Sequence, residues 1–198
     1  MRAFLAIEVP DTLKQDLGAL RDRLRESGTR ASWVATENMH LTLRFLGDIA
    51  ENDIEHLRIP VEAACATCPP IHLLINGAGA FPALRRPSVL WAGVQEASGA
   101  LTELQARLES AARTIGLPPE KKPFHPHITL ARIKDPRHPG DLPSLLEAEA
   151  HFAGGDFSTG HVSLFSSELT RQGAVYRRLR EFSLACSPSS FSKPLAPD

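Results

Sequence analysis

The segment HLTLRFLG, residues 40–47, decides how the rest of this chain is interpreted, because its first four letters return as HITL at residues 127–130. Each half of the 198-residue chain therefore holds one copy of the pattern His-aliphatic-Thr-Leu. Side chains two positions apart on a β-strand point to the same face of the sheet. If both copies are strands, each presents an imidazole and a hydroxyl on one side.

The aliphatic residues of the two copies fall on the opposite side, where they can anchor each strand in the core; they are Leu41, Leu43, Ile128 and Leu130. Strand-like and helix-like segments alternate around both copies. The patterns predict strands at 2–10, 39–47, 71–81, 88–94, 125–133, 157–169 and 176–184. They predict helices at 11–27, 51–68 with a break near Pro60, 98–116 and 141–150.

This order of elements predicts an α+β fold. Two related lobes that face each other across a cleft, with one motif from each, are the economical interpretation. A single α+β domain with a coincidental echo of the tetrapeptide fits the sequence equally well. We expect one bilobal domain over residues 1–186 and a disordered Pro/Ser-rich tail at 187–198.

Composition places the chain among soluble globular proteins, with 42% hydrophobic and 23% charged residues. The net charge of −1 excludes a strongly basic protein that binds nucleic acid nonspecifically. An anionic substrate must therefore be bound by basic residues at one local site. The apolar run at 3–7 is too short for a signal peptide, and no segment reaches membrane-spanning length. Three cysteines do not suggest a disulfide framework. We therefore expect a cytoplasmic protein.

Two imidazoles suit a reaction that needs one base and one acid near neutral pH. Attack on a phosphodiester is such a reaction, and the candidate catalytic pair is His40 with His127. The hydroxyls of Thr42 and Thr129 can donate hydrogen bonds to the phosphoryl oxygens. A single His-x-Thr is more often structural than catalytic, but two copies in strand context favour a site. This chemistry requires neither metal nor cofactor, and no nucleotide-binding motif is present.

The segments HLTLRFLG and FHPHITLAR resemble the two HxTx motifs of the 2H phosphoesterases, and in particular the RNA 2′,3′-cyclic phosphodiesterases, also called 2′-5′ RNA ligases. The resemblance extends to RAFLAIEVP and SELTRQGAVYRRLREFSL, and so covers nearly all of the chain. It implies two pseudo-symmetric lobes, each with an antiparallel sheet and helices, flanking a central active-site cleft.

The resemblance also implies roles. His40 would give a proton to the leaving 3′ oxygen and His127 would activate water, leaving a 2′-phosphate. ATP-independent 2′-5′ ligation would be the related transesterification. Arg132 would bind the phosphate, although strict alternation places it opposite His127 unless the strand bulges near Ala131. Alternation favours Arg44, which has the same parity as His40, so Arg132 is ranked first on the resemblance and Arg44 second.

Other residues are weaker candidates. Phe4 could stack on a base near the cleft, although core packing is the more usual role of such a residue. His125 lacks further metal ligands nearby, and Cys65 and Cys68 have the spacing of a redox pair but are better explained as buried thiols.

The leading hypothesis is therefore a hydrolase acting on RNA or oligonucleotide ends that carry a 2′,3′-cyclic phosphate. One alternative keeps the site and changes the substrate to a small cyclic nucleotide or ADP-ribose cyclic phosphate. Another is a noncatalytic RNA- or nucleotide-binding module. We expect a monomer without an obligatory protein partner.

Overall fold

A computed structural model describes residues 1–170 and 173–185 of the chain. The predicted tail at 187–198 lies outside the described residues, and the single domain over 1–186 stays a prediction. Along the chain the elements are β1 (Arg2–Glu8), α1 (Asp11–Arg25), β2 (Ala31–Trp33), the 3₁₀ turn η1 (Thr36–Asn38), β3 (His40–Asp48), α2 (Glu51–Ala66), β4 (Ile71–Phe81), β5 (Val89–Gln95), α3 (Ala100–Arg113), β6 (His127–Ile133), α4 (Leu142–Ala148), β7 (Ala153–Thr159), β8 (His161–Thr170) and β9 (Gly173–Ser183).

The strands form one curled sheet in which every pairing is antiparallel. Its order is β7-β4-β5-β6-β3-β1-β8-β9, and β2 pairs with β6. The two halves meet where β3 pairs with β6, through Leu41 opposite Ile128. The predicted α+β fold with antiparallel strands is confirmed, but the sheets expected for two lobes are joined into one, because the motif-bearing strands are themselves neighbours.

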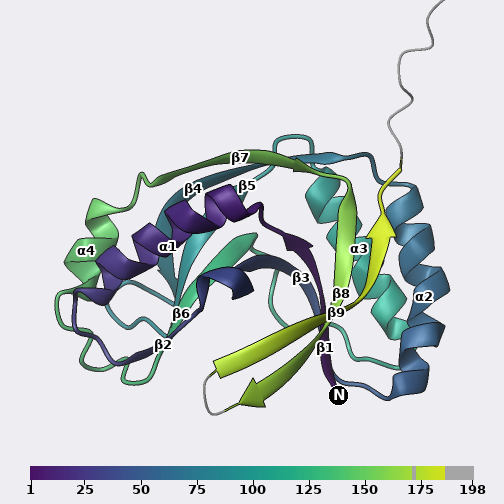
Figure 1. Ribbon diagram of the computed structural model, residues 1–198, viewed down its shortest axis with the longest axis horizontal. Coiled ribbons are helices and arrows are strands. Elements are labelled where there is room, and N and C mark those ends of the chain that lie inside the picture. Colours follow the sequence, from purple (N-terminus) through teal and green to yellow (C-terminus); the bar gives the residue numbers. More distant parts are fainter. Residues whose placement is uncertain (171–172, 186–198) are drawn as a thin grey trace, which may run out of the picture.

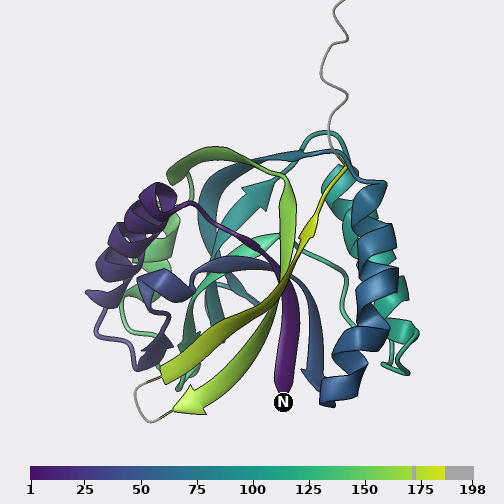
Figure 2. The same ribbon diagram turned by 45° about the vertical axis from the view of Figure 1, so that its right-hand side comes forward.

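Two pairs of helices cover the two halves of the sheet (Figures 1 and 2). Helices α1 and α4 pack together against the half that contains β4, β6 and β7, whereas α2 and α3 pack together beside β3 and β9. The apolar stripe of α1 buries Leu17, Leu20 and Leu24 completely. Burial of such a leucine contributes roughly 1.5–3 kcal/mol. This burial anchors α1 on its half of the sheet, and β6 and β3 lie in the middle of the strand order.

The structure corrects three details of the predicted elements. The segment 157–169 is not one strand, because the chain turns at Gly160 and passes from β7, which pairs with β4, to β8, which pairs with β1. Helix α2 is not broken at Pro60, since its buried face continues on both sides of that residue. Strand β2 was not predicted, because three residues are too few to show alternation.

Candidate active site

The two His-aliphatic-Thr-Leu motifs lie side by side at the centre of the sheet. Strand β3 carries the first, β6 carries the second, and Leu41 is the partner of Ile128 in the antiparallel register. The four aliphatic residues of the motifs are buried. Directly paired residues point to the same face of a sheet, and their neighbours on either side point to the other. Both histidines and both threonines therefore share one face.

Each histidine is held by a backbone carbonyl two residues earlier. Nδ1 of His40 lies 2.7 Å from the carbonyl oxygen of Asn38, and Nδ1 of His127 lies 2.6 Å from that of His125. Because a carbonyl oxygen can only accept, Nδ1 carries the hydrogen in both rings. Nε2 is therefore the atom whose protonation changes at each position. In the neutral ring, Nε2 of His40 accepts from the Thr42 hydroxyl at 3.0 Å.

Burial is the main influence on both imidazoles. It lowers the pKa of His40 below 6.5, against the opposing effect of the Asn38 carbonyl. Positive charge on Lys14 lowers this pKa further, the carboxylate of Glu8 raises it, and the charge of His127 lowers it. The histidines are thus close enough to influence each other's titration.

Burial also lowers the pKa of His127, and its own environment is more cationic than that of His40. The carbonyl of His125 raises this pKa, while the positive charges of Arg132 and of the His125 ring lower it. The His127 ring meets the edge of Phe81, with ring centroids 5.1 Å apart. No carboxylate is among the groups that act on His127, whereas Glu8 acts on His40.

A β-bulge follows the threonine in each motif and changes which residues share the face of the histidines. In β3, Thr42 and Arg44 pair with the consecutive residues Ala6 and Leu5, so Leu43 is the extra residue. Strand β6 repeats this arrangement at Leu130. Each bulge reverses the alternation beyond it. It turns Arg132 to the histidine face and turns Arg44 away from it.

The expectation that Arg44 binds the phosphate, drawn from strict alternation, is therefore wrong. The side chain of Arg44 is 5% exposed and forms ion pairs with Glu109 and Glu120, each at 2.6 Å. Its Nη2 also donates to the carbonyl oxygen of Pro118 at 2.6 Å. All of these partners lie in or after α3, so Arg44 connects the first motif to the segment that leads into the second.

A cavity of about 890 Å³ opens on the face of the histidines. Its wall includes His40, Thr42, Thr129 and Arg132, whereas His127 lies beside the cavity and not in the wall. This volume is at the upper end of the range for pockets that hold small ligands, about 300–1,000 Å³. There is thus room for a group much larger than a phosphate.

Aromatic rings surround His40 on one side of this cavity. Phe4 stacks on His40 with centroids 4.7 Å apart and on Phe165 with centroids 5.4 Å apart. Phe4 lines the cavity but is only 3% exposed, which agrees with core packing, the more usual role of such a residue, and leaves its ring little surface for a base. Tyr176 meets the edges of both Phe4 and His40, at 5.1 and 5.3 Å. Burial raises the pKa of Tyr176.

The sequence did not reveal the contribution of the β8–β9 hairpin to this wall. Ser167, Leu169 and Tyr176 from the hairpin line the cavity. The side-chain amide of Asn38 ties the hairpin to η1 by donating to the carbonyl oxygen of Ala174 at 2.7 Å. Tyr176 is the single tyrosine of the chain, but only the folded hairpin places it beside His40, which lies 136 positions earlier in the sequence.

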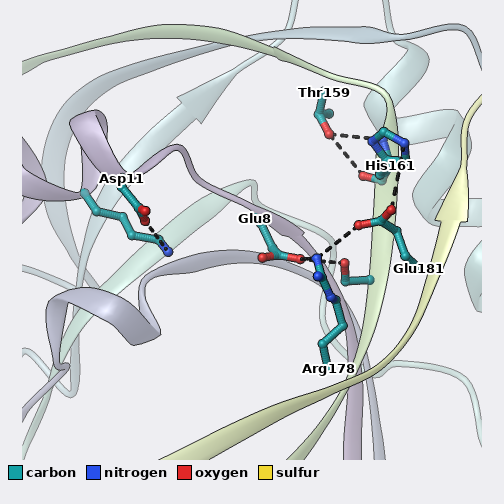
Figure 3. A network of polar contacts seen from close by, with 8 residues as sticks. Glu8, Asp11, Thr159, His161, Arg178 and Glu181 are labelled. Carbon is teal, nitrogen blue, oxygen red and sulfur yellow. Dashed lines mark hydrogen bonds and ion pairs between the residues drawn. The ribbon is translucent and has the colours of Figure 1, made fainter.

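A network of polar contacts occupies the sheet next to the first motif (Figure 3). Glu8 is the partner of His40 in the β1–β3 register. Its carboxylate accepts hydrogen bonds from Ser163 at 2.7 Å and from Arg178 at 3.1 Å, and Arg178 also contacts Glu181 at 3.0 Å. Because Glu8 is held by these partners, its negative charge stays at a fixed place beside His40.

The other candidates from the sequence do not assemble a second site in the described residues. His125 contributes its backbone carbonyl to His127. Cys65 and Cys68 are buried, and burial raises the pKa of Cys65 to about 12 and that of Cys68 to a lesser extent. Across residues 1–170 and 173–185, no group of three or more His, Cys, Asp or Glu side chains is arranged to hold a metal ion.

The fold and this pair of motifs define a phosphoesterase of the two-histidine type. The model of the family described as LigT like phosphoesterase matches residues 7–91 and 93–176. The chain belongs to this family, and the predicted resemblance is confirmed.

Several curated relatives carry the name RNA 2′,3′-cyclic phosphodiesterase. The protein from Aeropyrum pernix is 36% identical over 86% of this chain and 96% of its own length. The protein from Thermotoga maritima is 33% identical over 91% of this chain and 94% of its own length. Among solved structures, E. coli LigT complexed with 3′-AMP is similar with a TM-score of 0.72 and 26% identity, covering 92% of this chain and 97% of that one.

Proposed function

We propose that this protein hydrolyses 2′,3′-cyclic phosphate ends of RNA to 2′-phosphates, with His40 and His127 as the acid–base pair. The observation that carries the proposal is the placement of two imidazoles on adjacent central strands. Each has Nδ1 fixed to a carbonyl and Nε2 available for proton transfer. The name shared by the curated relatives supports the same reaction for this chain.

In the proposed reaction, Nε2 of His127 takes a proton from water while the water oxygen bonds to phosphorus. The bond between phosphorus and O3′ breaks, and protonated Nε2 of His40 gives its proton to O3′. The product keeps the phosphate on O2′, and the two histidines have exchanged protonation states. Positive Arg132 lowers the pKa of His127 and so disfavours a proton there, which supports His127 as the base. At His40 the positive charge of Lys14 lowers the pKa and the negative charge of Glu8 raises it, so the assignment of His40 as the acid rests on the family resemblance.

The phosphoryl oxygens need donors that neutralise their charge. Arg132 lies on the histidine face beyond the bulge and can form a bidentate pair with two nonbridging oxygens. The hydroxyls of Thr42 and Thr129 line the same wall. When a phosphate enters, the Thr42 hydroxyl can exchange His40 for a phosphoryl oxygen as its acceptor. That exchange frees Nε2 of His40 to face the leaving oxygen.

The test is turnover of an oligonucleotide ending in 2′,3′-cyclic phosphate by protein treated with EDTA. We expect turnover to persist in EDTA and to fall by about two or more orders of magnitude in both His40→Ala and His127→Ala. Activity that survives both substitutions would refute acid–base catalysis by this pair. Identification of the product as the 2′-phosphate, not the 3′-phosphate, checks which bond breaks.

The alternatives from the sequence are separated by the choice of substrate. A phosphodiesterase for small molecules would turn over a cyclic mononucleotide or ADP-ribose cyclic phosphate faster than the oligonucleotide. A binding module would bind these ligands without turnover. Ligation would appear when a 5′-hydroxyl oligonucleotide is supplied without ATP, and would depend on the same histidines.

No helix in the part of the chain that the structure describes is long and apolar enough to cross a membrane. We also propose that the protein is cytoplasmic and monomeric. Buried thiols at Cys65 and Cys68, which the structure does not join in a disulfide, are compatible with a reducing compartment. Gel filtration with light scattering tests the monomer, and fractionation of the source cells tests the location.

A further inference from the structure

Three cations lie in a row that starts in the cavity wall and leaves it along the end of β6. Arg132 lines the cavity, Lys134 follows two positions later, and Arg30 lies beside Lys134. The backbone N–H of Lys134 donates to the carbonyl oxygen of Arg30 at 2.8 Å, which continues the pairing of Ser32 with Arg132 between β2 and β6. Paired residues share a face of the sheet, and so do residues two apart on one strand. The three cations therefore share the face of the histidines.

None of the three cations is neutralised by a carboxylate. In the part of the chain that the structure describes, they form no ion pair, and all three are exposed. The acid closest to them along the chain, Asp135, is instead paired with Arg137 and His138 of its own loop. An exposed row of cations without protein partners attracts an anion from outside. Because the whole chain carries a net charge of −1, this row is a local feature of one face.

The spacing of the row matches the repeat of a nucleic-acid strand. Two positions along a β-strand span about 6.6 Å, so Lys134 lies about that far beyond Arg132. The sugar between two successive phosphates of an RNA strand holds them at a similar separation. A groove that binds single-stranded nucleic acid follows the backbone with cations in this way. A phosphate bound by Arg132 at the histidines therefore has the next phosphate of its strand beside Lys134 and Arg30.

Arg2 is the other cation without an ion pair among the described residues that line the cavity, but it lies too far away to bind that next phosphate. Thr42 is the partner of Ala6 in the β1–β3 register, and Arg2 lies four positions earlier on β1. Four positions span about 13 Å, about twice the separation of successive phosphates. The geometry thus favours the row along β6.

We propose that Lys134 and Arg30 bind the phosphate on the 5′ side of the nucleotide that carries the cyclic phosphate. This inference rests on the proposed function, which supplies the nucleotide and places its cyclic phosphate between the histidines and Arg132. A mononucleotide with a free 5′-hydroxyl leaves both cations unused, whereas an RNA chain has a phosphodiester there. The contact is made to the backbone and carries no base information. The row therefore selects RNA ends over small cyclic nucleotides, whatever their sequence.

The experiment compares adenosine 2′,3′-cyclic phosphate with the same nucleotide bearing a 5′-phosphate. In wild-type protein at low salt we expect kcat/KM to be higher for the 5′-phosphorylated nucleotide by about 2- to 30-fold, the range for two exposed ion pairs. This ratio should fall towards one in about 1 M salt, where charges are screened beyond about 3 Å. Lys134→Gln and Arg30→Gln should each lower the ratio, and the double variant should bring it near one. Lys134→Glu combined with Arg30→Gln should bring it below one, because like charges repel.

The matched control is Arg58→Gln, which removes one positive charge from a partly exposed side chain on α2, outside the cavity wall. It should leave the ratio unchanged, which separates a local contact from the charge of the whole molecule. The inference is overturned if the double variant keeps the wild-type ratio, or if Arg2→Gln removes the preference instead. It is also overturned if a dinucleotide ending in cyclic phosphate is preferred but the 5′-phosphorylated mononucleotide is not, because the preceding sugar or base would then supply the gain.

Equilibrium binding separates this inference from the proposed function. A wild-type ratio near one overturns the inference and leaves the proposed function intact. If the wild-type protein hydrolyses no cyclic phosphate, adenosine 2′-phosphate and adenosine 2′,5′-bisphosphate are titrated by calorimetry at low salt instead. Tighter binding of the bisphosphate that disappears in the double variant supports the inference even though the proposed function has failed. Equal binding of the two ligands by wild-type protein overturns it.

Discussion

Arg132, which the resemblance favours as the phosphate ligand, and Arg44, which strict alternation favours, should respond to substitution in opposite ways. Arg44 is buried, and its ion pairs with Glu109 and Glu120 connect β3 to α3 and the following segment. Arg132 lines the cavity on the histidine face. Arg44→Met should therefore lower stability, and Arg132→Met should lower activity.

The structure sets the magnitude for Arg44. Glu109 is only 16% exposed, so Arg44→Met leaves a largely buried carboxylate whose remaining cation, Arg113, lies 3.8 Å away. Breaking a buried pair in this way costs about 3–5 kcal/mol. With a urea m-value of about 2 kcal/mol/M, the unfolding midpoint should fall by about 1.5–2.5 M. The double variant Arg44→Met, Glu109→Leu should recover much of this loss, because replacing both partners with apolar residues is often nearly neutral.

The assay combines urea unfolding, followed by circular dichroism, with turnover of a cyclic nucleotide at low temperature, where Arg44→Met remains folded. We expect a kcat/KM for Arg44→Met within a few-fold of wild type. For Arg132→Met we expect a loss of about 10²–10³-fold, the effect of removing one donor to a developing oxyanion, and an unchanged urea midpoint.

The reasoning fails if Arg44→Met retains wild-type stability while kcat/KM falls by 100-fold or more. That result would place Arg44 at the phosphate and would mean that the bulge at Leu43 does not turn its side chain away. A large loss of stability in Arg132→Met would likewise contradict the position of Arg132 in the cavity wall.

Three further predictions concern pH, the hairpin and packing. Burial lowers the pKa of both His40 and His127 below 6.5, so the form of the site with one proton on the pair is most populated below pH 6.5 and is lost as pH rises. The profile of kcat/KM against pH should therefore be bell-shaped with its maximum below pH 6.5. A maximum above pH 7 would contradict this prediction. Asn38→Ala should raise KM several-fold with a smaller change in kcat, because it removes the hydrogen bond that holds the hairpin forming one wall of the cavity. Steady-state kinetics test this, and a fall in kcat with an unchanged KM would contradict it. Gly79→Ala should lower stability by about 1–3 kcal/mol, because a Cβ there would overlap the Trp91 ring. An unchanged melting temperature would argue against that close approach.

Much of the fold could be predicted because the signals were local. The apolar spacing of α1 and α3 and the alternation in the motif strands are properties of short segments, and the structure confirms those elements. Gly160 was not recognised as a turn because a single glycine between two strand-like segments can also be accommodated inside one continuous strand. The adjacency of β3 and β6 depends on contacts between the halves of the chain, which no single segment encodes.

The site was only partly visible for the same reason. The histidines and threonines follow from alternation, but the bulges at Leu43 and Leu130 do not, since neither position is a glycine or proline that would announce one. The consequence was a wrong face for Arg44, whereas the bulge considered near Ala131 lies at Leu130 and accounts for the face of Arg132. Phe4 lies near the site, as alternation indicated, but its burial depends on rings from other strands, namely His40, Phe165 and Tyr176. Tyr176 was missed because the hairpin alone brings it to the site.

The single ladder pair between Leu41 and Ile128 makes the spacing of the two imidazoles a property of the whole sheet. A connection of one residue pair between two strands resists rotation much less than the longer strand pairings within each half. The angle between the half-sheets therefore governs how far apart the two imidazoles stand. Substitutions that change this angle, such as those where the helices pack on the half-sheets, should change turnover without altering any residue that contacts the substrate.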